Sequence, residues 1–297
     1  MLLLTGATGL VGSALLGRLL AEETPVRCLV RDPERLGAQR VRVQIALGDL
    51  TDPPSFRNAM RGVHTVVHLA ASIRDQPRGS IEELNGIATW RMVRAAERAG
   101  VERFVFFSAL GASEHHRARF FRAKALAEQA VRESDMRSIV FAPSIVYAPG
   151  DDWLALLERL SLLPMMPISG TGRAVYEPIW AEDVADCAMA ALRAPENPSG
   201  QDQTELYELA GPERLSHSEI VRLVLRSTNR RRLLVHIPTP VVSRALRVLE
   251  SVMGSRTIAT WDEAELMECP MLAQRGTADA RRLGVTPRQM QAVLSVG

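Results

Sequence analysis

A glycine-spaced turn at the amino terminus constrains this chain more than any other feature. The apolar residues 1–4 lead into Gly6-x-x-Gly9-x-x-Gly12, and residues 13–21 follow with helical spacing of apolar side chains. Strand, glycine turn and helix are the parts of a dinucleotide pocket, where Gly6 permits the tight turn and Gly9 admits the pyrophosphate. Gly12 lets the helix pack close to the strand, so that its free N–H groups face the phosphates. The alternative is an ordinary structural turn.

Length and composition limit the remaining choices. The chain has 297 residues, 46% apolar and 24% charged, as in ordinary globular proteins with one or two domains. A formal charge of +2 gives no indication of nucleic acid. The cysteines Cys28, Cys187 and Cys269 are far apart, so we expect neither a disulfide framework nor a metal site. Without a transmembrane-length apolar run or a targeting peptide, we expect a cytoplasmic protein.

The end of the second predicted strand, residues 25–30, selects the cofactor. An acidic residue there would hold the ribose hydroxyls of NAD, whereas arginine suits the 2′-phosphate of NADP. Arg31 comes first, followed by Asp32, with Arg35 nearby. We therefore favour NADP, with NAD as the alternative, because a guanidinium binds phosphate with two donors. Both arginines could instead be solvated loop residues.

Further residues are expected against the cofactor. Asp49, after a strand predicted at 41–45, can reach the adenine edge, or it could cap a helix at 53–60. Small residues after the buried strand 64–69 would let the backbone lie against the cofactor. His64 and His68 have no partner at ligand spacing and are interpreted as structural. The additional cofactor residues predicted by these arguments are Thr8, Leu10, Val11, Leu50, Ala70, Ala71, Pro143 and Ile145.

Strands and helices alternate through the first half, which predicts a doubly wound parallel α/β sheet. A helix at 81–99 carries an apolar stripe that includes Ile87, and Asn85 interrupts it, so this amide should bond backbone near the site. Ser108 ends the strand 101–107, and chemistry in open α/β sheets lies outside such strand ends. A helix at 120–133 and a strand at 138–141 follow.

The pattern changes after Gly150. Late strands are predicted at 175–180 and 207–209, with a helix at 181–192 between them. Residues 153–168 are rich in Leu and Met, which suits either an apolar substrate wall or the core of a cap. An amphipathic helix at 240–253 could dock a partner or membrane, or pack in the cap. We therefore divide the chain into a Rossmann core, residues 1–150, and residues 151–297, where the last core strands interleave with a substrate-binding cap.

Taken together, these segments resemble the short-chain dehydrogenase/reductase superfamily, in its extended and atypical branches. The resemblance runs from the cofactor loop at 5–12 through Leu29-Val-Arg-Asp-Pro33, Gly48-Asp-Leu50 and His68-Leu-Ala-Ala71 to Leu283-Gly-Val-Thr-Pro287. It covers nearly the whole chain and implies an NAD(P)-binding Rossmann fold of the epimerase/dehydratase type. The chain is most similar to NmrA-type proteins and to the nucleotide-binding accessory subunit of respiratory complex I.

One departure from this family's pattern bears on activity. The resemblance implies a catalytic Ser, then Tyr-x-x-x-Lys; Ser108 and Lys124 match, but the Tyr position is Phe120. Phenylalanine has no proton to give, so the usual carbonyl–alcohol proton shuttle is lost. Tyr147 is our candidate for a displaced catalytic hydroxyl. Weaker candidates are Tyr176 and the pair His115 and His116.

Three functions therefore compete. The first is an NADPH-dependent oxidoreductase acting on a quinone or another apolar conjugated acceptor, with Ser108 bonding the acceptor oxygen and Lys124 the nicotinamide ribose. The second is a catalytically silent NAD(P)(H)-binding sensor or assembly protein with a protein partner. The third is a sugar-nucleotide epimerase or dehydratase, which needs the missing Tyr most.

Overall fold

The computed structural model describes residues 1–194, 204–253 and 260–296. Its centre is a seven-stranded sheet in which every neighbouring pair of strands is parallel. The strands, in spatial order, are β11 (Thr204–Leu209), β6 (Arg137–Pro143), β5 (Arg103–Phe107), β4 (Thr65–His68), β1 (Leu2–Thr5), β2 (Val26–Val30) and β3 (Gln44–Leu47). This sheet confirms the predicted doubly wound α/β fold.

Alternation along the strands fills both faces of the sheet. Leu2 and Leu4 of β1 pack with helices α1 (Leu10–Ala21) and α6 (Ala181–Arg193), whereas Leu3 points to the opposite layer. That layer contains α2 (Pro53–Phe56), η2 (Arg57–Met60), α3 (Ala88–Arg98) and α4 (Arg119–Arg132). The central strands β1 and β4 are covered on both faces and are buried along their whole length, as central parallel strands usually are.

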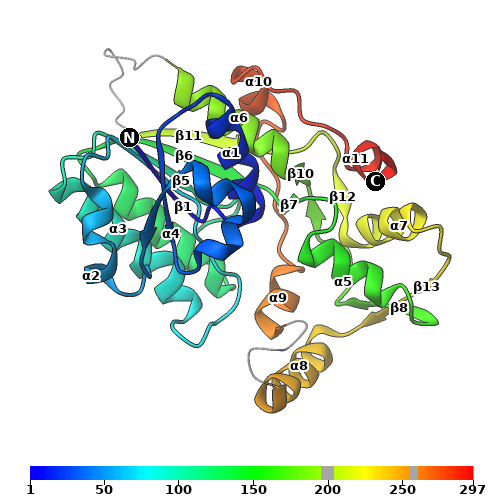
Figure 1. Cartoon of the computed structure of the whole chain (residues 1–297). Coiled ribbons are helices and arrows are strands. Elements are labelled where there is room, and N and C mark those ends of the chain that lie inside the picture. The colour runs from blue at the N-terminus through cyan, green and yellow to red at the C-terminus, as the bar shows by residue number, and fades with distance from the viewer. Residues whose placement is uncertain (195–203, 254–259, 297) are drawn as a thin grey trace.

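The second half adds a smaller layer beside the carboxyl ends of the strands, on the right in Figure 1. Its core contains Tyr147, Leu154, Met166, Tyr176 and Ile220, all fully or almost fully buried. The other helices of the second half are α5 (Asp152–Leu160), α7 (His217–Ser227), α8 (Thr239–Met253), α9 (Trp261–Leu266), α10 (Ala278–Arg282) and α11 (Met290–Val296). Of these, α10 packs on the main sheet, where Ala280 shares a core with Leu209 of β11, and Leu266 of α9 packs against Phe121 of α4. The strands of the smaller layer pair as β7 (Val146–Tyr147) with β10 (Ile179–Trp180), β9 (Val175–Tyr176) with β12 (Leu215–Ser216), and β8 (Met165–Ser169) with β13 (Leu233–Ile237).

The chain crosses between the two halves. Strand β11 lies in the second half of the sequence but pairs with β6 in the main sheet, where Tyr207 aligns with Phe141. Helix α6 packs on α1, and Arg18 bonds Glu182 and Asp186 at 2.6 Å each. The division at residue 150 remains a prediction, since β11 and α6 make the core depend on the second half.

Several predicted elements have different boundaries. The strand predicted at 41–45 is wrong in register: Val41 lies in the 3-10 segment η1 (Pro33–Arg42), and β3 occupies Gln44–Leu47. Alternation misled the prediction because this edge strand leaves Ile45 and Leu47 exposed. The strand at 175–180 is split into β9 and β10.

The helix predicted at 81–99 contains a π-helical turn, η3 (Glu83–Ile87), before α3. A π turn holds an extra residue and shifts the side chains that follow, so Ile87 is exposed instead of lying on the buried stripe. Asn85 lies inside this turn and is buried, as its place on the core side predicted.

Two findings bear on membranes and metals. Among the described residues, no helix is long and apolar enough to span a membrane. Those same residues contain no cluster of three His, Cys, Asp or Glu side chains that could hold a metal ion. For the amphipathic helix predicted at 240–253, the side chains of residues 245 and 248–253 lie outside what the structure describes.

Candidate functional site

The glycine turn is built by two close backbone approaches. Gly6 has φ +73°, and a Cβ there would stand 2.7 Å from the backbone nitrogen of Ala70. A Cβ on Gly12 would stand 2.0 Å from the carbonyl oxygen of Gly6, so α1 rests directly on the turn. The turn after β1 and the segment after β4 therefore meet, as the predicted roles of Gly6 and Ala70 require.

Gly9 has a different environment from the other two glycines. A Cβ on Gly9 would meet only the carbonyl oxygen of Gly6, at the ordinary contact distance of 3.4 Å. Gly9 is the N-cap of α1 and accepts from Ser13 N at 2.9 Å, and among the described residues no side chain caps this helix end. Gly9 and Leu10 are exposed, and Thr8 and Val11 are half-buried. The first turn of α1 thus presents free N–H groups on an open surface, which fits a pyrophosphate.

The edge of the sheet beyond β2 carries the basic residues expected near an NADP phosphate. Arg31 is exposed and donates to Gln76 Oε1 at 3.1 Å, while Arg35 is exposed on η1. Asp32, which would favour NAD, accepts from Glu34 N at 3.0 Å and caps η1. This edge therefore presents the exposed guanidinium groups of Arg31 and Arg35 beside the Asp32 carboxylate.

Asp49 follows β3 at the same edge. Its Oδ1 accepts from Thr51 N at 3.0 Å and from Thr51 Oγ1 at 2.9 Å, and Arg78 lies 3.2 Å from Oδ2. The alternative role of capping the helix at 53–60 is wrong, because Asp52 is the N-cap there. Burial opposes ionisation, yet these bonds and the charge of Arg31 lower the pKa of Asp49. Leu50, beside it, is half-buried against the sheet layer.

A buried chain of polar side chains supports the segment after β4. Thr5 Oγ1 and His68 Nδ1 are 2.8 Å apart, and His68 Nε2 lies 3.1 Å from Thr89 Oγ1. The Thr89 hydroxyl donates its hydrogen to Asn85 O at 2.6 Å, so its oxygen must accept the hydrogen bond from His68 Nε2–H. The other ring nitrogen of His68, Nδ1, therefore carries no hydrogen and accepts from the Thr5 hydroxyl. Burial, with Lys124 nearby, lowers the pKa of His68 to about 3, so His68 is neutral and structural as predicted.

Asn85 completes this support. Its Nδ2 donates to the carbonyl oxygens of Ser72 and Ile81 at 2.7 Å each, and its Oδ1 accepts from Ser72 N at 3.1 Å. The predicted bonding of backbone near the site is confirmed. The buried amide fixes the end of the segment 69–72, which contains Ala70 and the exposed Ala71.

Ser108 and Lys124 come together at the end of β5. Ser108 Oγ donates to Glu128 Oε1, and Lys124 Nζ donates to Phe107 O at 2.6 Å. Both side chains are buried. Burial lowers the pKa of Lys124 to about 7, and the Glu128 carboxylate limits the fall. A buried amine that titrates near neutrality is able to take up and release a proton at physiological pH.

Phe120 occupies the position expected for tyrosine and lies over this lysine. Its ring centroid is 5.7 Å from Lys124 Nζ and 5.6 Å from the ring of Phe121. Phe120 packs against an apolar cluster that includes Phe121 and Leu266, and Met267 and Met271, from the chain after α9, pack against the same cluster. The site therefore has an apolar lining where the resemblance implies a hydroxyl.

The other candidate hydroxyls lie in the cap. Tyr147 is fully buried in the cap core, and among the described residues its hydroxyl has no hydrogen-bond partner. Burial, with Asp183 and Glu213 nearby, raises the pKa of Tyr147. Tyr176 donates to Met267 O. The catalytic role of Tyr147 remains a prediction, since its described neighbours are those of the cap core.

The remaining candidates lie at loops beside the site. His116 Nδ1 accepts from Ala118 N at 3.0 Å, and His115 is exposed. Pro143 ends β6 and accepts from Leu110 N at 2.9 Å, and Ile145 O accepts from Ile179 N at 3.0 Å. Pro143 and Ile145 are thus at the carboxyl edge, as a cofactor role would require.

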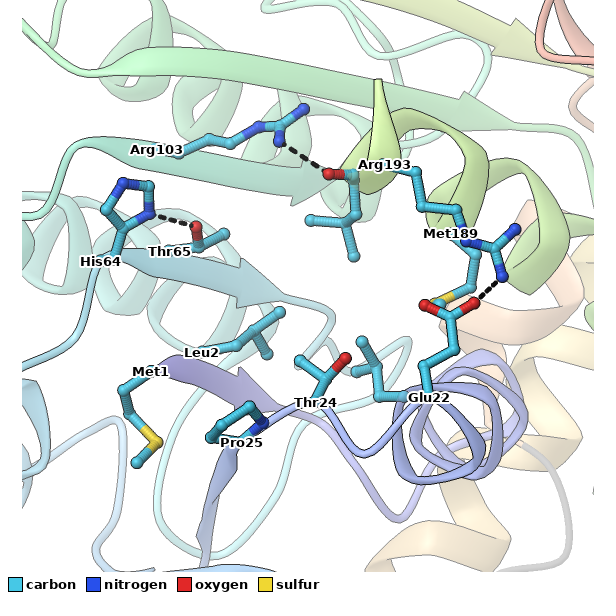
Figure 2. A pocket seen from close by; sticks show the side chains of 12 residues that line it. Met1, Leu2, Glu22, Thr24, Pro25, His64, Thr65, Arg103, Met189 and Arg193 are labelled. Carbon is cyan, nitrogen blue, oxygen red and sulfur yellow. Dashed lines mark hydrogen bonds and ion pairs between the residues drawn. The ribbon is translucent and has the colours of Figure 1, made fainter. Parts of the chain in front are cut away.

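A separate cavity lies at the opposite edge of the sheet. Figure 2 shows it beside the starts of β1, β4 and β5, where Arg103 turns toward the end of α6 and Arg193 pairs with Glu22. Its volume is about 260 Å³. Ligands of open α/β sheets bind outside the carboxyl ends of the strands, so this cavity is not the predicted cofactor site.

Comparison with known proteins decides the family. A family model described as NAD(P)H-binding matches residues 6–195. The chain belongs to this NAD(P)H-binding family. Ceramide reductase of Caulobacter vibrioides is 30% identical over 195 residues, 65% of this chain and 61% of that enzyme. The chain thus spans about three fifths of the length of that family relative.

Other family relatives match over more of the chain. NAD(P)H azoreductase of Xenophilus azovorans is 28% identical over 77% of this chain and 74% of that enzyme. The mitochondrial NADH dehydrogenase (ubiquinone) 1 alpha subcomplex subunit 9 of Mus musculus is 25% identical over 96% of this chain and 76% of that protein. Triphenylmethane reductase of a Citrobacter species, complexed with NADP(H), superposes with a TM-score of 0.75 at 16% identity, covering 99% and 98% of the two chains, and shows the shared fold. The predicted family is confirmed.

The structure adds site residues that the sequence prediction missed. Glu128 binds Ser108, and its spacing one helical turn after Lys124 was a signal that could have identified it. Gln76 and Arg78 reach Arg31 and Asp49 from the loop after Ser72. No periodicity marks that loop, so only the fold brings it to the cofactor edge.

Proposed function

We propose that this protein is an NADPH-dependent oxidoreductase that acts on an apolar conjugated acceptor such as a quinone. The observation that carries the proposal is the buried Lys124, with a pKa of about 7, beside the Ser108–Glu128 pair at the carboxyl end of β5. Burying an amine costs folding free energy, and a structural core would be better filled by an apolar side chain. A strongly shifted group in this place favours a functional site.

The absence of a tyrosine hydroxyl favours a conjugated acceptor. Reduced nicotinamide supplies a hydride when it is bound. A conjugated acceptor spreads the negative charge that develops over several atoms, so it needs a weaker positioned acid than an isolated ketone does. In the proposal, the Ser108 hydroxyl turns from Glu128 to the acceptor oxygen when the acceptor binds and donates its single hydrogen there. Lys124 holds the nicotinamide ribose, and its Nζ exchanges a proton near neutral pH.

Several features support an apolar acceptor and NADPH. Phe120, Met267 and Met271 supply an apolar lining. Arg78, which pairs with Asp49, and Arg31, whose charge lowers the pKa of Asp49, supply cations where the 2′-phosphate of NADP would lie. The names of two relatives, ceramide reductase and NAD(P)H azoreductase, agree with an apolar or conjugated substrate and with nicotinamide-dependent reduction.

Two measurements test the proposal. Calorimetric titration with NADPH and NADH measures cofactor binding and preference. NADPH oxidation is then followed by absorbance with a series of quinones, with saturated ketones of similar size as controls. We expect turnover with quinones and little with ketones. Binding of NADPH without oxidation in the presence of any acceptor contradicts the oxidoreductase proposal.

A second candidate is a catalytically silent NAD(P)(H)-binding sensor or accessory protein with a protein partner. Phe120 over Lys124 favours it, since the hydroxyl of the proton shuttle is absent. The likeness to the mouse NADH dehydrogenase subunit supports it over nearly the whole chain. Cofactor binding without turnover, together with a stable complex in a pull-down, is its expected result. An epimerase or dehydratase is less favoured because these reactions depend most on a tyrosine hydroxyl, and the position expected for that tyrosine is Phe120.

We also propose a cytoplasmic location. The three cysteines are free and buried, which suits a reducing compartment in which NADPH is available. Fractionation of cells that produce the tagged protein, with markers for each compartment, tests this location.

A further inference from the structure

The far end of the cap carries a group of apolar side chains on its surface. Leu162 is 64% exposed, Leu163 46%, Met165 53% and Leu233 70%. The four come from two segments that lie side by side, because Met165 of β8 pairs with Leu233 of β13. We call Leu162, Leu163, Met165 and Leu233 the aliphatic tip. Figure 1 shows β8 and β13 at the border of the molecule, away from the seven-stranded sheet.

The apolar character of this tip is not explained by packing. Along β8 the next residue, Met166, is fully buried in the cap core, and its partner Leu234 packs against the same core. Alternation therefore turns Met165 and Leu233 outward, at positions where a two-stranded ribbon normally carries polar side chains. Contiguous exposed aliphatic groups of this kind mark an interaction surface.

Arginines border the tip and are fixed beside it. Arg230 donates to Ser161 Oγ at 2.7 Å, and Arg232 donates to the carbonyl oxygens of Ser161 and Leu163 at 3.0 and 2.8 Å. Arg231, between them, is exposed. Residues 220–249 contain seven arginines and no Asp or Glu. The backbone of Glu158 also accepts from Arg230, and its exposed side chain is an acidic group at the margin.

We infer that this tip docks the protein on the surface of a membrane with anionic lipids. Aliphatic side chains that project beyond a row of guanidinium groups match the layering of such a surface, where phosphates lie above the acyl chains. The tip contains no aromatic residue, whereas the centres of protein interfaces are enriched in Tyr, Trp and Phe. Nucleic acid would give the projecting leucines no partner.

The test is co-sedimentation of the full chain with vesicles of phosphatidylcholine, with and without phosphatidylserine. We expect binding to the vesicles that contain phosphatidylserine, and we expect salt to weaken it. Arg231→Glu changes two charge units and should weaken binding roughly 30-fold. The double variant Leu162→Gln, Leu233→Gln should weaken it roughly 10-fold or more. These side chains are exposed, so the variants are expected to fold, which circular dichroism checks.

Matched controls lie on η1 and α3, which pack around the seven-stranded sheet and not in the cap. Val41→Gln alters an exposed apolar residue of η1, and Arg98→Glu reverses an exposed charge on α3. Both should bind vesicles as the unchanged protein does. Three results overturn the inference: no sedimentation with anionic vesicles, equal binding to neutral ones, or equal losses in the controls. Conversion of a dimer to a monomer by the tip variants, seen by sedimentation velocity, also overturns it and assigns the tip to self-association.

Discussion

The ring of Phe120 lies 5.7 Å from the Nζ of Lys124, so the buried amine faces a hydrocarbon where family relatives are expected to place a phenol. The two residues are one helical turn apart on α4. In the pattern that the resemblance implies, a tyrosine hydroxyl at position 120 would exchange a proton with the substrate oxygen, and Lys124 would lower the pKa of that hydroxyl.

Phe120→Tyr tests this relationship directly. Phe120 is only half-buried, so the added hydroxyl should be accommodated without loss of fold. We expect reduction of isolated ketones to rise on the order of 100-fold, the usual contribution of a positioned general acid. Phe120→Leu is the control, because it alters the ring without adding a hydroxyl. Equal ketone reduction by both variants would count against the proton-transfer explanation.

Lys124 predicts a pH dependence of stability. Its pKa is lowered from 10.5 in the unfolded chain to about 7 in the folded one. Between these values the unfolded state binds the proton and the folded state does not, so stability rises with pH across the window and is lost as pH falls toward 7. A shift of this size corresponds to roughly 5 kcal/mol.

Lys124→Met should therefore be more stable than the unchanged protein below pH 7, and the difference should shrink as pH approaches 10.5. Urea unfolding at several pH values measures it. A constant difference between the two proteins at every pH would show that Lys124 keeps its ordinary pKa.

Gly9 and Gly12 should respond differently to the same change. Gly9→Val is expected to fold, because a Cβ there meets only an ordinary contact, and to lose dinucleotide binding because its side chain fills the pyrophosphate space. Gly12→Val places a Cβ 2.0 Å from a backbone oxygen and should prevent normal folding. Calorimetric titration and thermal unfolding separate the two effects. Undiminished cofactor binding by a folded Gly9→Val protein would remove the glycine turn from the site.

Arg31→Ala tests the preference for NADPH. We expect NADPH affinity to fall about 10- to 100-fold, the loss of a charge-assisted bond to phosphate, with little change for NADH. Arg78→Ala should show a smaller effect of the same kind, since Arg78 already pairs with Asp49. Arg40→Ala, an exposed residue of η1, is the control. Equal losses for the two cofactors would withdraw the NADP assignment.

Tyr147→Phe separates a catalytic from a structural role for this residue. In the part of the chain that the structure describes, its buried hydroxyl has no hydrogen-bond partner, so removing it should raise the free energy of unfolding by about 1–2 kcal/mol. Loss of quinone turnover in this variant would support Tyr147 as the displaced acid. Unchanged turnover with higher stability would assign it to the cap core alone.

The sequence predicts most of the residues that form the glycine turn after β1. The backbone approaches closely at Gly6, Gly12 and Ala70, and small residues are needed at such positions. Residue type and spacing therefore predict these positions. The predicted position of β3 is wrong because Ile45 and Leu47 lie on an exposed edge of the sheet. At such an edge, the alternation of apolar and polar residues does not indicate which side chains are buried. The prediction that Ile87 lies on the buried stripe is wrong because the residue types in this helix do not indicate a π turn.

Long-range contacts account for the site features that could not be predicted. Arg78 reaches Asp49 across 29 positions of sequence, and the bond from Ser108 to Glu128 spans 20. Such pairs depend on how β3, β5 and α4 are arranged in three dimensions. Tyr147 follows the end of β6, as the sequence indicates, but its burial in the cap core depends on the pairing of β7 with β10, which the sequence does not show.

The parallel pairing of β11 with β6 has a consequence for anyone who wishes to study the nucleotide-binding half in isolation. A fragment that stops near residue 150 would lack the strand that covers one side of β6, and it would leave Phe141 without Tyr207 and α1 without α6. Expressed alone, this fragment would expose the unpaired edge of β6 and apolar side chains, and it would be expected to aggregate. Studies of the nucleotide-binding half should therefore use a chain that includes β11 and α6.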